Sequence, residues 1–347
     1  MTGPARTAVR SAPPGARGSG ELLDLMRGFV VAKSLFVAAD LTVADLLAGG
    51  PRPVAELAAA TETHPDALRR LLRALCGVEV FTDAGGDRFG LGRLGPGLLT
   101  AGPHSVRNWL LVNGGPVFRA FDGMPEAVRS GRPAFADLFG RSFFDHMKRS
   151  TQDGQWFHAA MDEISRHTAD ALLAAYDFRG VTSVVDVGGG RGGLLAALLR
   201  AHASLRGTVF DRPEVVRTAR ATVAAAGVAD RCELRGGDFF RSVPAGADCY
   251  LLSWILHDWD DSAALRLLRS CRRAIPATGR LLLVEALLPP ADRPHFAHFG
   301  DLVMLVALGG RERTEEQYAA LLAAAGFRLA RVIPTGEPRS LLEAVPW

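Results

Sequence analysis

The spacing of hydrophobic positions divides the chain into two parts. Before about residue 176 the apolar side chains recur at helical spacing, as Leu22, Met26 and Phe29 do near the start. From Thr182 onward they form short runs separated by helical stretches. These runs predict strands at 184–187, 208–210, 232–235, 249–253, 281–284 and 329–333. Strands that alternate with helices imply an α/β fold with a mostly parallel sheet covered on both faces.

The first hundred residues predict a winged helix. The apolar stripe of the first helix runs to Val37, and a short helix follows at 43–47. Two amphipathic helices at 54–60 and 66–76 precede short strands at 80–82 and 88–91, which flank a turn rich in Gly and Asp. Residues 105–175 are expected to be helical throughout.

A winged helix raises the alternative of DNA binding. The second helix of the pair carries only three basic residues, Arg69, Arg70 and Arg73, and acidic side chains lie close by in the sequence. Binding to DNA needs a basic face that releases several counterions. The element is therefore expected to serve dimerisation and enclosure of a substrate, and no nucleic-acid partner is expected.

Composition narrows the class of protein further. A chain of 347 residues is long enough for two domains, and its 40 basic and 37 acidic residues nearly balance. The cysteines have no metal-binding spacing and are expected to be reduced thiols: Cys76, Cys232, Cys249 and Cys271. No apolar run suits a membrane span or a secretory signal, so no membrane partner is expected and the expected location is the cytoplasm.

The most informative stretch is Val184-Val185-Asp186-Val187-Gly188-Gly189-Gly190-Arg191-Gly192-Gly193. Glycines at a strand-to-helix turn let a ligand approach the backbone closely at the sheet edge. Gly188, Gly190 and Gly193 also fit the GxGxxG pattern of dinucleotide sites, so an NAD-dependent oxidoreductase is an alternative. Asp186 disfavours it, because a carboxylate there repels a pyrophosphate but suits the positively charged sulfonium and ammonium of S-adenosylmethionine (SAM).

Two further acidic residues follow the next strands. Asp211 ends the second strand, where its carboxylate can accept hydrogen bonds from both ribose hydroxyls of a nucleotide. Asp238 follows the third strand and can accept from an adenine amino group, while Phe239 covers the ring. Each of these acids could instead serve only as a helix cap or turn residue.

With the run from Ser253 to Asp261, SWILHDWDD, the chain resembles a known family. It is similar over about residues 20–345 to bacterial small-molecule O-methyltransferases related to plant caffeic acid O-methyltransferases. The resemblance rests on the DxGxGxG loop, the DxP turn at Asp211, the GGDFF turn, the HDW motif and a late GGRERT motif. It implies a class I methyltransferase fold, Rossmann-like, with a winged-helix dimerisation domain.

The resemblance also implies a domain plan, a cofactor and a partner. The expected domains are a disordered tail at 1–20, a winged-helix-like dimerisation domain at 21–104, a helical region that encloses the substrate at 105–177, and a SAM-binding domain at 178–347. The cofactor is SAM, with S-adenosylhomocysteine (SAH) as its product, and no metal is expected. The protein is expected to be a homodimer.

Site residues follow from the resemblance as well. His257 is the general base, Glu312 in the GGRERT motif steadies its imidazole, and Glu285, placed after the fifth strand, is the second flanking carboxylate. Ser253 and Ser165 are cofactor contacts, although plant relatives have a lysine at the position of Ser253. The candidate substrate contacts are Met161, Met304, Trp156 and Phe157.

The predicted function is methylation of a hydroxyl on a small aromatic natural product, a phenol or phenolic acid of secondary metabolism. About one phenol in a thousand is ionised at neutral pH, so a neutral histidine of ordinary pKa near 6.5 is expected to take the proton. The alternatives are a SAM-binding family member that catalyses another reaction, and a winged-helix DNA-binding regulator.

Overall fold

The computed structural model describes residues 14–336 and 339–347, and the chain divides into two compact units between Gly114 and Gly115. The first unit contains the predicted helix pair and hairpin, with a third short strand that the sequence pattern did not predict. Its strands form a sheet in the order β1-β3-β2. The elements of this unit are α1 Pro14–Met26, α2 Gly28–Asp40, α3 Val43–Leu46, β1 Arg52–Pro53, α4 Val54–Ala60, α5 Pro65–Cys76, β2 Phe81–Asp83, β3 Arg88–Leu91, η1 Gly95–Leu98 and α6 Arg107–Val112, and η2 Asn113–Val117 spans its end.

Helix α5 shows why this part folds as predicted. Leu68, Leu72 and Leu75 lie on one face of the helix and are completely or almost completely buried. Arg69 on the same helix pairs with Asp66 at 3.0 Å and with Asp87 of the hairpin at 2.7 Å. One of its three arginines is therefore committed to carboxylates within the protein, which weakens the case for DNA contact.

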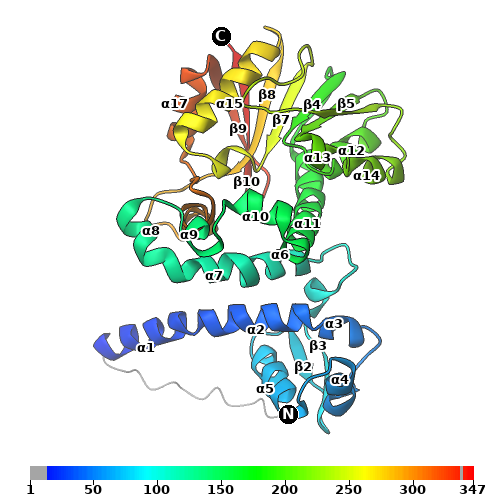
Figure 1. Ribbon diagram of the computed structural model, residues 1–347, viewed down its shortest axis with the longest axis vertical. Coiled ribbons are helices and arrows are strands. Elements are labelled where there is room, and N and C mark those ends of the chain that lie inside the picture. The colour runs from blue at the N-terminus through cyan, green and yellow to red at the C-terminus, as the bar shows by residue number, and fades with distance from the viewer. Residues whose placement is uncertain (1–13, 337–338) are drawn as a thin grey trace, which may run out of the picture. The chain divides into compact units, whose positions relative to one another are not determined.

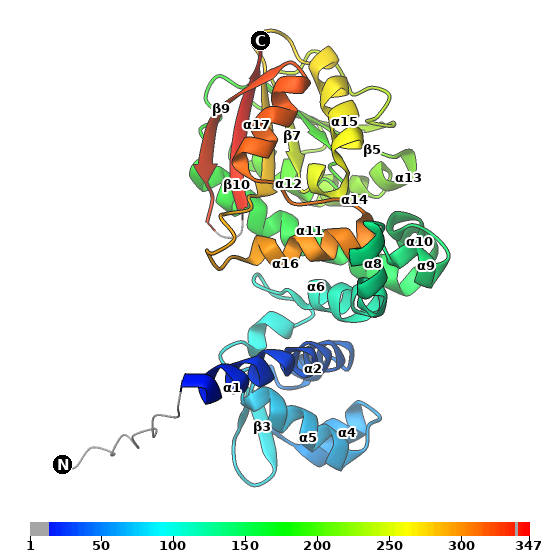
Figure 2. The same cartoon turned by 90° about the vertical axis from the view of Figure 1, so that its left-hand side faces the viewer.

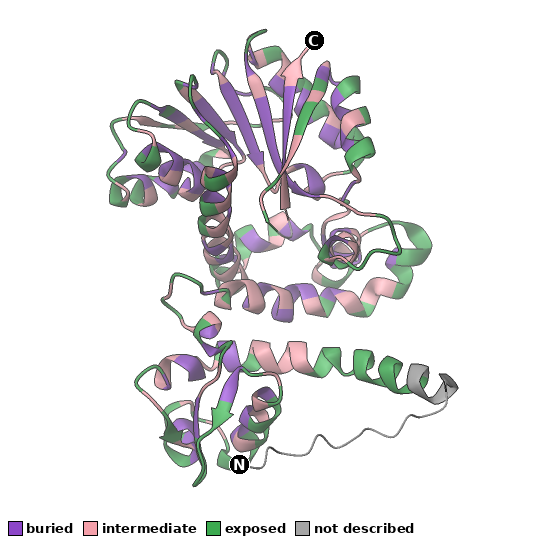
Figure 3. Cartoon of the chain, turned by 180° about the vertical axis from the view of Figure 1, so that it is seen from behind, coloured by how far each residue is buried: buried purple, intermediate pink, exposed green. Residues whose placement is uncertain are grey.

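Helix α1 begins earlier than the apolar pattern indicated. Residues 14–20 of the expected tail are helical, because extending a helix that has already nucleated costs little, and residues 1–13 lie outside the described residues. Residues 19–30, at the end of α1 and the start of α2, are exposed (Figure 3), and their apolar side chains are exposed too: Leu25 is 76% and Phe29 is 54% exposed. Such a continuous apolar surface is typical of an interaction face.

The second unit begins with helices that lead to its sheet. Helix α11 is the longest, and the Ser150 side chain caps its start by accepting a hydrogen bond from the Asp153 backbone N–H at 3.2 Å. The helices before the sheet are α7 Phe118–Ala120, η3 Phe121–Gly123, α8 Met124–Ser130, α9 Phe135–Phe139, α10 Phe143–Arg149 and α11 Thr151–Ala175. No helix of the described residues is both long and apolar enough to cross a membrane.

The sheet of the second unit has the strand order β6-β5-β4-β7-β8-β10-β9, as Figure 1 shows. Its strands β6, β5, β4, β7 and β8 are parallel, whereas β10 runs antiparallel to both β8 and β9. Every predicted strand is present, with its ends shifted by no more than two residues. The strands are β4 Ser183–Val187, β5 Arg206–Asp211, β6 Cys232–Gly236, β7 Cys249–Ser253, β8 Arg280–Ala286, β9 Phe327–Pro334 and β10 Arg339–Pro346.

Strand β10 was missed by the sequence prediction. Glu343 interrupts its apolar run, and an unpaired carboxylate is unfavourable inside a sheet. In the structure Glu343 is only 6% exposed. Its carboxylate tolerates this burial because Tyr176 donates a hydrogen bond to it at 2.9 Å and Arg331 donates another at 2.6 Å. These partners lie far along the chain or on another strand, so the local pattern gave no sign of them.

Helices cover both faces of this sheet (Figures 1 and 2). Alternate strand residues pack against α11, α12 and α14 on one face and against α15 and α17 on the other. The carboxyl ends of β4, β5 and β7 meet at one edge, where open α/β sheets bind ligands. The remaining helices are α12 Gly193–Ala201, α13 Pro213–Val216, α14 Ala219–Ala225, η4 Leu256–Asp258, α15 Asp261–Ala274, α16 Phe296–Val303, η5 Met304–Leu308 and α17 Glu315–Ala324.

Candidate active site

The glycine loop after β4 leaves open space beside its backbone. Gly188 has φ +77° and Gly190 has φ +57°, in the left-handed region that favours glycine. A Cβ atom added to Gly188 would lie 2.5 Å from the Ile255 side chain, whereas one added to Gly190 would meet no protein atom within 4 Å. Gly188 therefore lets the chain pack closely, and Gly190 borders a space that a ligand can fill.

Asp186 lies beneath this loop with a carboxylate oxygen that the protein does not satisfy. The residue is 2% exposed, and among the described residues Oδ2 has no hydrogen-bond partner. Burial, together with the nearby Asp211 carboxylate, raises the pKa of Asp186 to about 7. A positively charged ligand would offset this cost, because an opposite charge favours the ionised carboxylate.

Asp211 joins the end of β5 to the glycine loop. Its Oδ2 accepts a hydrogen bond from the Gly190 backbone N–H at 2.9 Å, and its Oδ1 accepts one from Arg212 N–H at 2.6 Å. Burial raises the pKa of this carboxyl group. The carboxylate thus fixes the glycine loop at Gly190.

Asp238 and Phe239 lie in the turn after β6, at the same edge of the sheet. Asp238 Oδ1 accepts from the Phe240 backbone N–H at 2.9 Å, so the residue does act as a turn former. The Phe239 ring packs at 6.0 Å from the ring of Trp259, which belongs to the HDW motif. The GGDFF turn and the HDW motif are therefore neighbours in space.

Ser165 lies against the glycine loop from the side of helix α11. A Cβ atom added to Gly193 would lie 3.5 Å from Ser165 Cβ. An ion pair of 2.9 Å between Arg191 and Asp162 also connects the loop to α11. Ser253 is the last residue of β7 and is partly buried at the same edge.

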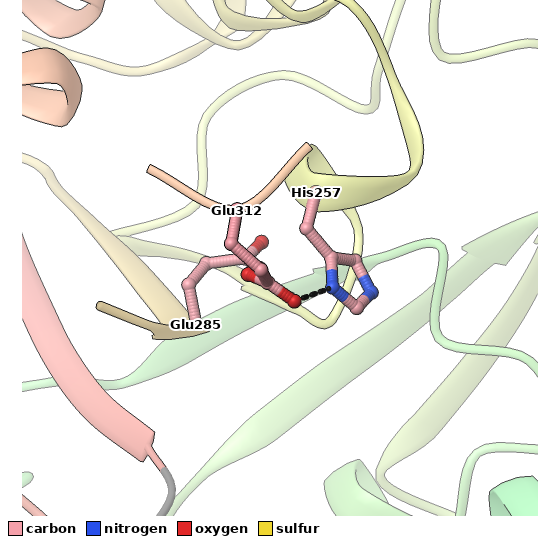
Figure 4. Close-up of side chains that lie close together, drawn as sticks. All are labelled: His257, Glu285 and Glu312. Carbon is pink, nitrogen blue, oxygen red and sulfur yellow. Dashed lines mark hydrogen bonds and ion pairs between the residues drawn. The ribbon is translucent and has the colours of Figure 1, made fainter. Parts of the chain in front are cut away.

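His257 lies in the short helical turn after β7 and pairs with a carboxylate from a distant part of the chain (Figure 4). Its Nδ1 is 2.9 Å from Glu312 Oε1, and both residues are less than 5% exposed. The sequence analysis placed Glu285 after its strand, but it is the next-to-last residue of β8. Glu285 accepts hydrogen bonds from the backbone N–H groups of Ile255 at 3.2 Å and Leu256 at 2.8 Å, so it holds the turn rather than the imidazole.

The GGRERT motif holds the same turn from the other side. A Cβ atom on Gly310 would lie 2.0 Å from the His257 carbonyl oxygen, so only glycine fits there. The Arg311 backbone N–H donates to that carbonyl at 2.8 Å. Arg313, 1% exposed, donates to the Leu256 carbonyl at 3.1 Å. Two motifs that are 55 residues apart at His257 and Glu312 therefore form one rigid unit.

The surroundings of His257 favour its protonated form, whereas the sequence predicted a neutral imidazole. Burial lowers the pKa of His257, but the carboxylates of Asp258, Glu312 and Glu285 more than offset this and raise it to about 10. Burial raises the pKa of Glu285 to about 7 and that of Asp258 to about 6. The carboxylates nearest the imidazole therefore favour its protonated form before an acceptor binds.

Comparison with protein-family models decides the family. Residues 121–328 match the family model described as "O-methyltransferase domain". Residues 23–101 match the model described as "O-methyltransferase dimerisation domain". The chain belongs to the O-methyltransferase family. It is a SAM-dependent O-methyltransferase with the class I fold, and its dimerisation domain is the helical first unit.

Individual relatives extend over nearly the whole O-methyltransferase chain. The phenazine O-methyltransferase PhzM of Lysobacter antibioticus is 42% identical over 325 residues, which cover 94% of this chain and 95% of the relative. The aclacinomycin 10-hydroxylase RdmB of Streptomyces purpurascens is 39% identical over 317 residues, covering 89% and 84%. The solved structure of CalO1 from calicheamicin biosynthesis, in its SAH-bound form, has a TM-score of 0.85 and 38% identity, covering 96% and 99%.

The sequence analysis did not single out Asp258, although it is adjacent to His257 in the methyltransferase motif. Its Oδ1 lies 3.4 Å from His257 Nε2, the nitrogen not used by Glu312. Trp254 was also missed. It has φ +57°, uncommon for a bulky residue, and its ring meets the His257 ring edge-on at 5.1 Å. In the sequence Trp254 is only an aromatic residue directly after a strand, which indicates neither its positive φ nor its contact with the His257 ring.

The four candidate substrate contacts lie in two elements of the methyltransferase unit. Trp156, Phe157 and Met161 are partly buried in α11, and Met304 is buried at the start of η5. The Phe157 ring packs against Phe143 at 5.4 Å, which gives it a core role. His295 caps α16, and His298 bonds a backbone carbonyl, so both have local structural roles.

Proposed function

We propose that this enzyme methylates a hydroxyl group of a small aromatic natural product and that His257 is the general base. The proposal is supported above all by the buried contact of 2.9 Å between His257 Nδ1 and Glu312 Oε1, which turns Nε2 away from Glu312. Asp258 Oδ1 lies 3.4 Å from Nε2, and an acceptor hydroxyl would take its place there. The similarity to a phenazine O-methyltransferase supports an aromatic acceptor. S-adenosylmethionine, when bound, supplies an activated methyl group on a positively charged sulfur.

The residues of this chain perform binding, orientation and proton removal. Asp186, Asp211, Asp238 and the glycine loop would hold the cofactor, with contributions from Phe239, Ser253 and Ser165. Removal of a proton from the hydroxyl at Nε2 makes the oxygen a better nucleophile, and Glu312 stabilises the resulting imidazolium. Because the neighbouring carboxylates favour the protonated imidazole, we expect one proton to leave the site when the phenol binds.

The test is methyl transfer to a panel of phenols and phenolic acids with the full-length enzyme, analysed by product mass. A hydroxylated product without a methyl group would instead favour the reaction named for the relative RdmB. The assay is run with and without a chelator, because the atoms of His257, Glu285 and Glu312 lie within 4.8 Å of one another and could hold a metal ion. Methyl transfer that needs a metal would contradict the proposed proton removal by a free imidazole.

Replacement of Glu312 by glutamine is expected to change the pH profile of methyl transfer. Loss of one of three carboxylates lowers the pKa of His257, so the rate should level off at a lower pH than in the wild type. The plateau rate should fall by less than roughly 10²-fold, because the base itself remains. Glu315→Gln, at an exposed position three residues away, serves as the control and should leave the profile unchanged. A profile for Glu312→Gln that shifts to higher pH would refute this role.

We further propose that the apolar stripe of α1 and α2 forms the interface of a homodimer. This interface is supported by the exposure of Leu22, Leu25 and Phe29 and by the match to a dimerisation domain. Deletion of residues 1–48 should give a monomeric or aggregating protein with little activity. Deletion of residues 1–13, which precede α1, should give a protein that still sediments as a dimer and has unchanged activity. An active, well-behaved monomer from the longer deletion would exclude the interface.

A further inference from the structure

Arg339 lies at the ligand-binding edge of the sheet but is not used by the proposed chemistry. It is the first residue of β10 and pairs with Ala286, the last residue of β8. Because β10 is antiparallel to β8, its start lies at the same edge as the carboxyl ends of the parallel strands. His257 follows β7 at that edge, two strands away in the order β7-β8-β10.

The Arg339 guanidinium lacks a carboxylate partner among the described residues. Its Nε is buried without a hydrogen-bond partner, and no ion pair joins it to a described acidic residue. Burial lowers the pKa of Arg339 to about 10, so it remains charged at neutral pH. The other arginines of this region are paired: Arg280 and Arg331 with Glu343, and Arg313 with Asp261. A partly buried, unpaired charge is costly, and an anionic ligand would compensate that cost.

Trp254 connects this charge to the catalytic histidine. The Arg339 guanidinium carbon lies 4.7 Å from the centre of the Trp254 ring, and the same ring meets the His257 ring at 5.1 Å and 90°. The Trp254 backbone N–H donates to the Val284 carbonyl at 3.0 Å, which helps to hold its left-handed conformation. The cation, the indole and the imidazole thus form a continuous row in one unit of the protein.

The spacing between strands separates the Arg339 guanidinium from the place expected for the carboxylate of SAM. Neighbouring strands lie about 4.8 Å apart, so the start of β10 is roughly 10 Å from the end of β7 and roughly 14 Å from β4 and the glycine loop. Arg339 therefore lies nearer to the end of β7, which His257 follows, than to the glycine loop.

We propose that Arg339 binds a carboxylate on the acceptor, so that the enzyme prefers aromatic acids whose hydroxyl and carboxylate lie at opposite ends. This inference rests on the proposed function, since it assumes that the reacting hydroxyl meets His257. Arginine suits the role because its planar fork binds both oxygens of a carboxylate at once. The Trp254 ring offers a surface alongside which the aromatic part of the acid packs.

Binding to the full-length enzyme loaded with SAH provides the test, with para-coumarate and its uncharged methyl ester as probes. Wild type should bind the acid at least roughly tenfold more tightly than the ester by calorimetry, as a charge-assisted hydrogen-bonded pair requires. Arg339→Gln should remove this preference, and Arg339→Lys should keep part of it, because the charge remains without the fork. The affinity for SAH should be unchanged in both.

Two controls make the result decisive. Arg328→Gln changes an exposed arginine on β9, with the same loss of charge, and should leave the preference intact. Glu337→Gln removes a carboxylate two positions away in the sequence and should alter affinity for the acid by less than twofold. A several-fold gain in that variant would show that Glu337 already neutralises Arg339 and would overturn the proposal.

The remaining outcomes separate this inference from the proposed function. Equal binding of acid and ester by wild type, binding of neither, or a preference that survives Arg339→Gln would overturn the role of Arg339. Methyl transfer that depends on His257 but does not favour acids would leave the proposed function standing. Lost methyl transfer to every phenol, with the acid preference in binding intact, would contradict the proposed function alone.

Discussion

Replacement of His257 by alanine is expected to reduce the turnover of a phenolic acceptor by about 10²–10⁴-fold at neutral pH, which corresponds to roughly 2.7–5.5 kcal/mol of activation free energy. The affinity for SAM should stay within a few-fold of wild type, because His257 bonds Glu312 and lies near Asp258 rather than the glycine loop. Stopped assays of methylated product and calorimetry with SAH measure the two quantities separately.

High pH should partly rescue the His257→Ala variant. In the wild type an imidazolium and a phenolate attract each other at contact, so the bound pair loses a proton at a lower pH than either group alone. The wild-type rate therefore levels off below the pKa near 10 of a free phenol, whereas the variant continues to rise toward that value. The ratio of the two rates should narrow between pH 7 and pH 10.

Controls distinguish loss of the base from loss of the fold. His257→Asn keeps much of the side-chain volume and should be as slow as His257→Ala. His298→Ala changes a partly buried histidine that bonds the Arg293 carbonyl, and should leave the rate unchanged. An undiminished rate for His257→Ala across pH 6–9 would show that the base assignment is wrong and that positioning alone carries the reaction.

Replacement of Gly190 by valine is expected to abolish binding of the cofactor while leaving a folded protein. The residue has φ +57°, and its missing Cβ points into space that no protein atom occupies within 4 Å. The valine side chain would fill this space, and a β-branched residue would also strain the left-handed backbone. Calorimetric titration with SAH measures the loss, and the melting temperature reports the strain.

Gly180→Val is the matched control for that experiment. Gly180 has φ +79°, is exposed and has no atom within 4 Å of an added Cβ, but it lies before β4, away from the ligand-binding edge. Its variant should show a similar loss of stability with normal binding of SAH. Near-normal affinity in Gly190→Val would place the cofactor elsewhere in the enzyme.

Much of the fold follows from local sequence patterns. The strands from β4 to β9 and the helix pair α4 and α5 were predicted because each carries a period of apolar residues that only one type of element satisfies. The glycine loop was predicted because its glycines stand between an apolar strand and an apolar helix. Strand β10 was not, because its buried Glu343 depends on partners at Tyr176 and Arg331.

The sequence by itself determined which strands and helices follow one another along the chain, apart from β1 and β10. It also determined the glycine loop and the residue types of the site, because all of these depend on neighbours along the chain. Only the tertiary structure decided that Glu312 meets His257, that Glu285 holds the turn instead, and that the surrounding carboxylates raise the pKa of the imidazole. Electrostatic interactions act across space and grow stronger with burial, so a pKa depends on groups that are distant in sequence. The same reason explains why Arg339, which has no carboxylate partner among the described residues, became visible as a candidate only in the folded chain.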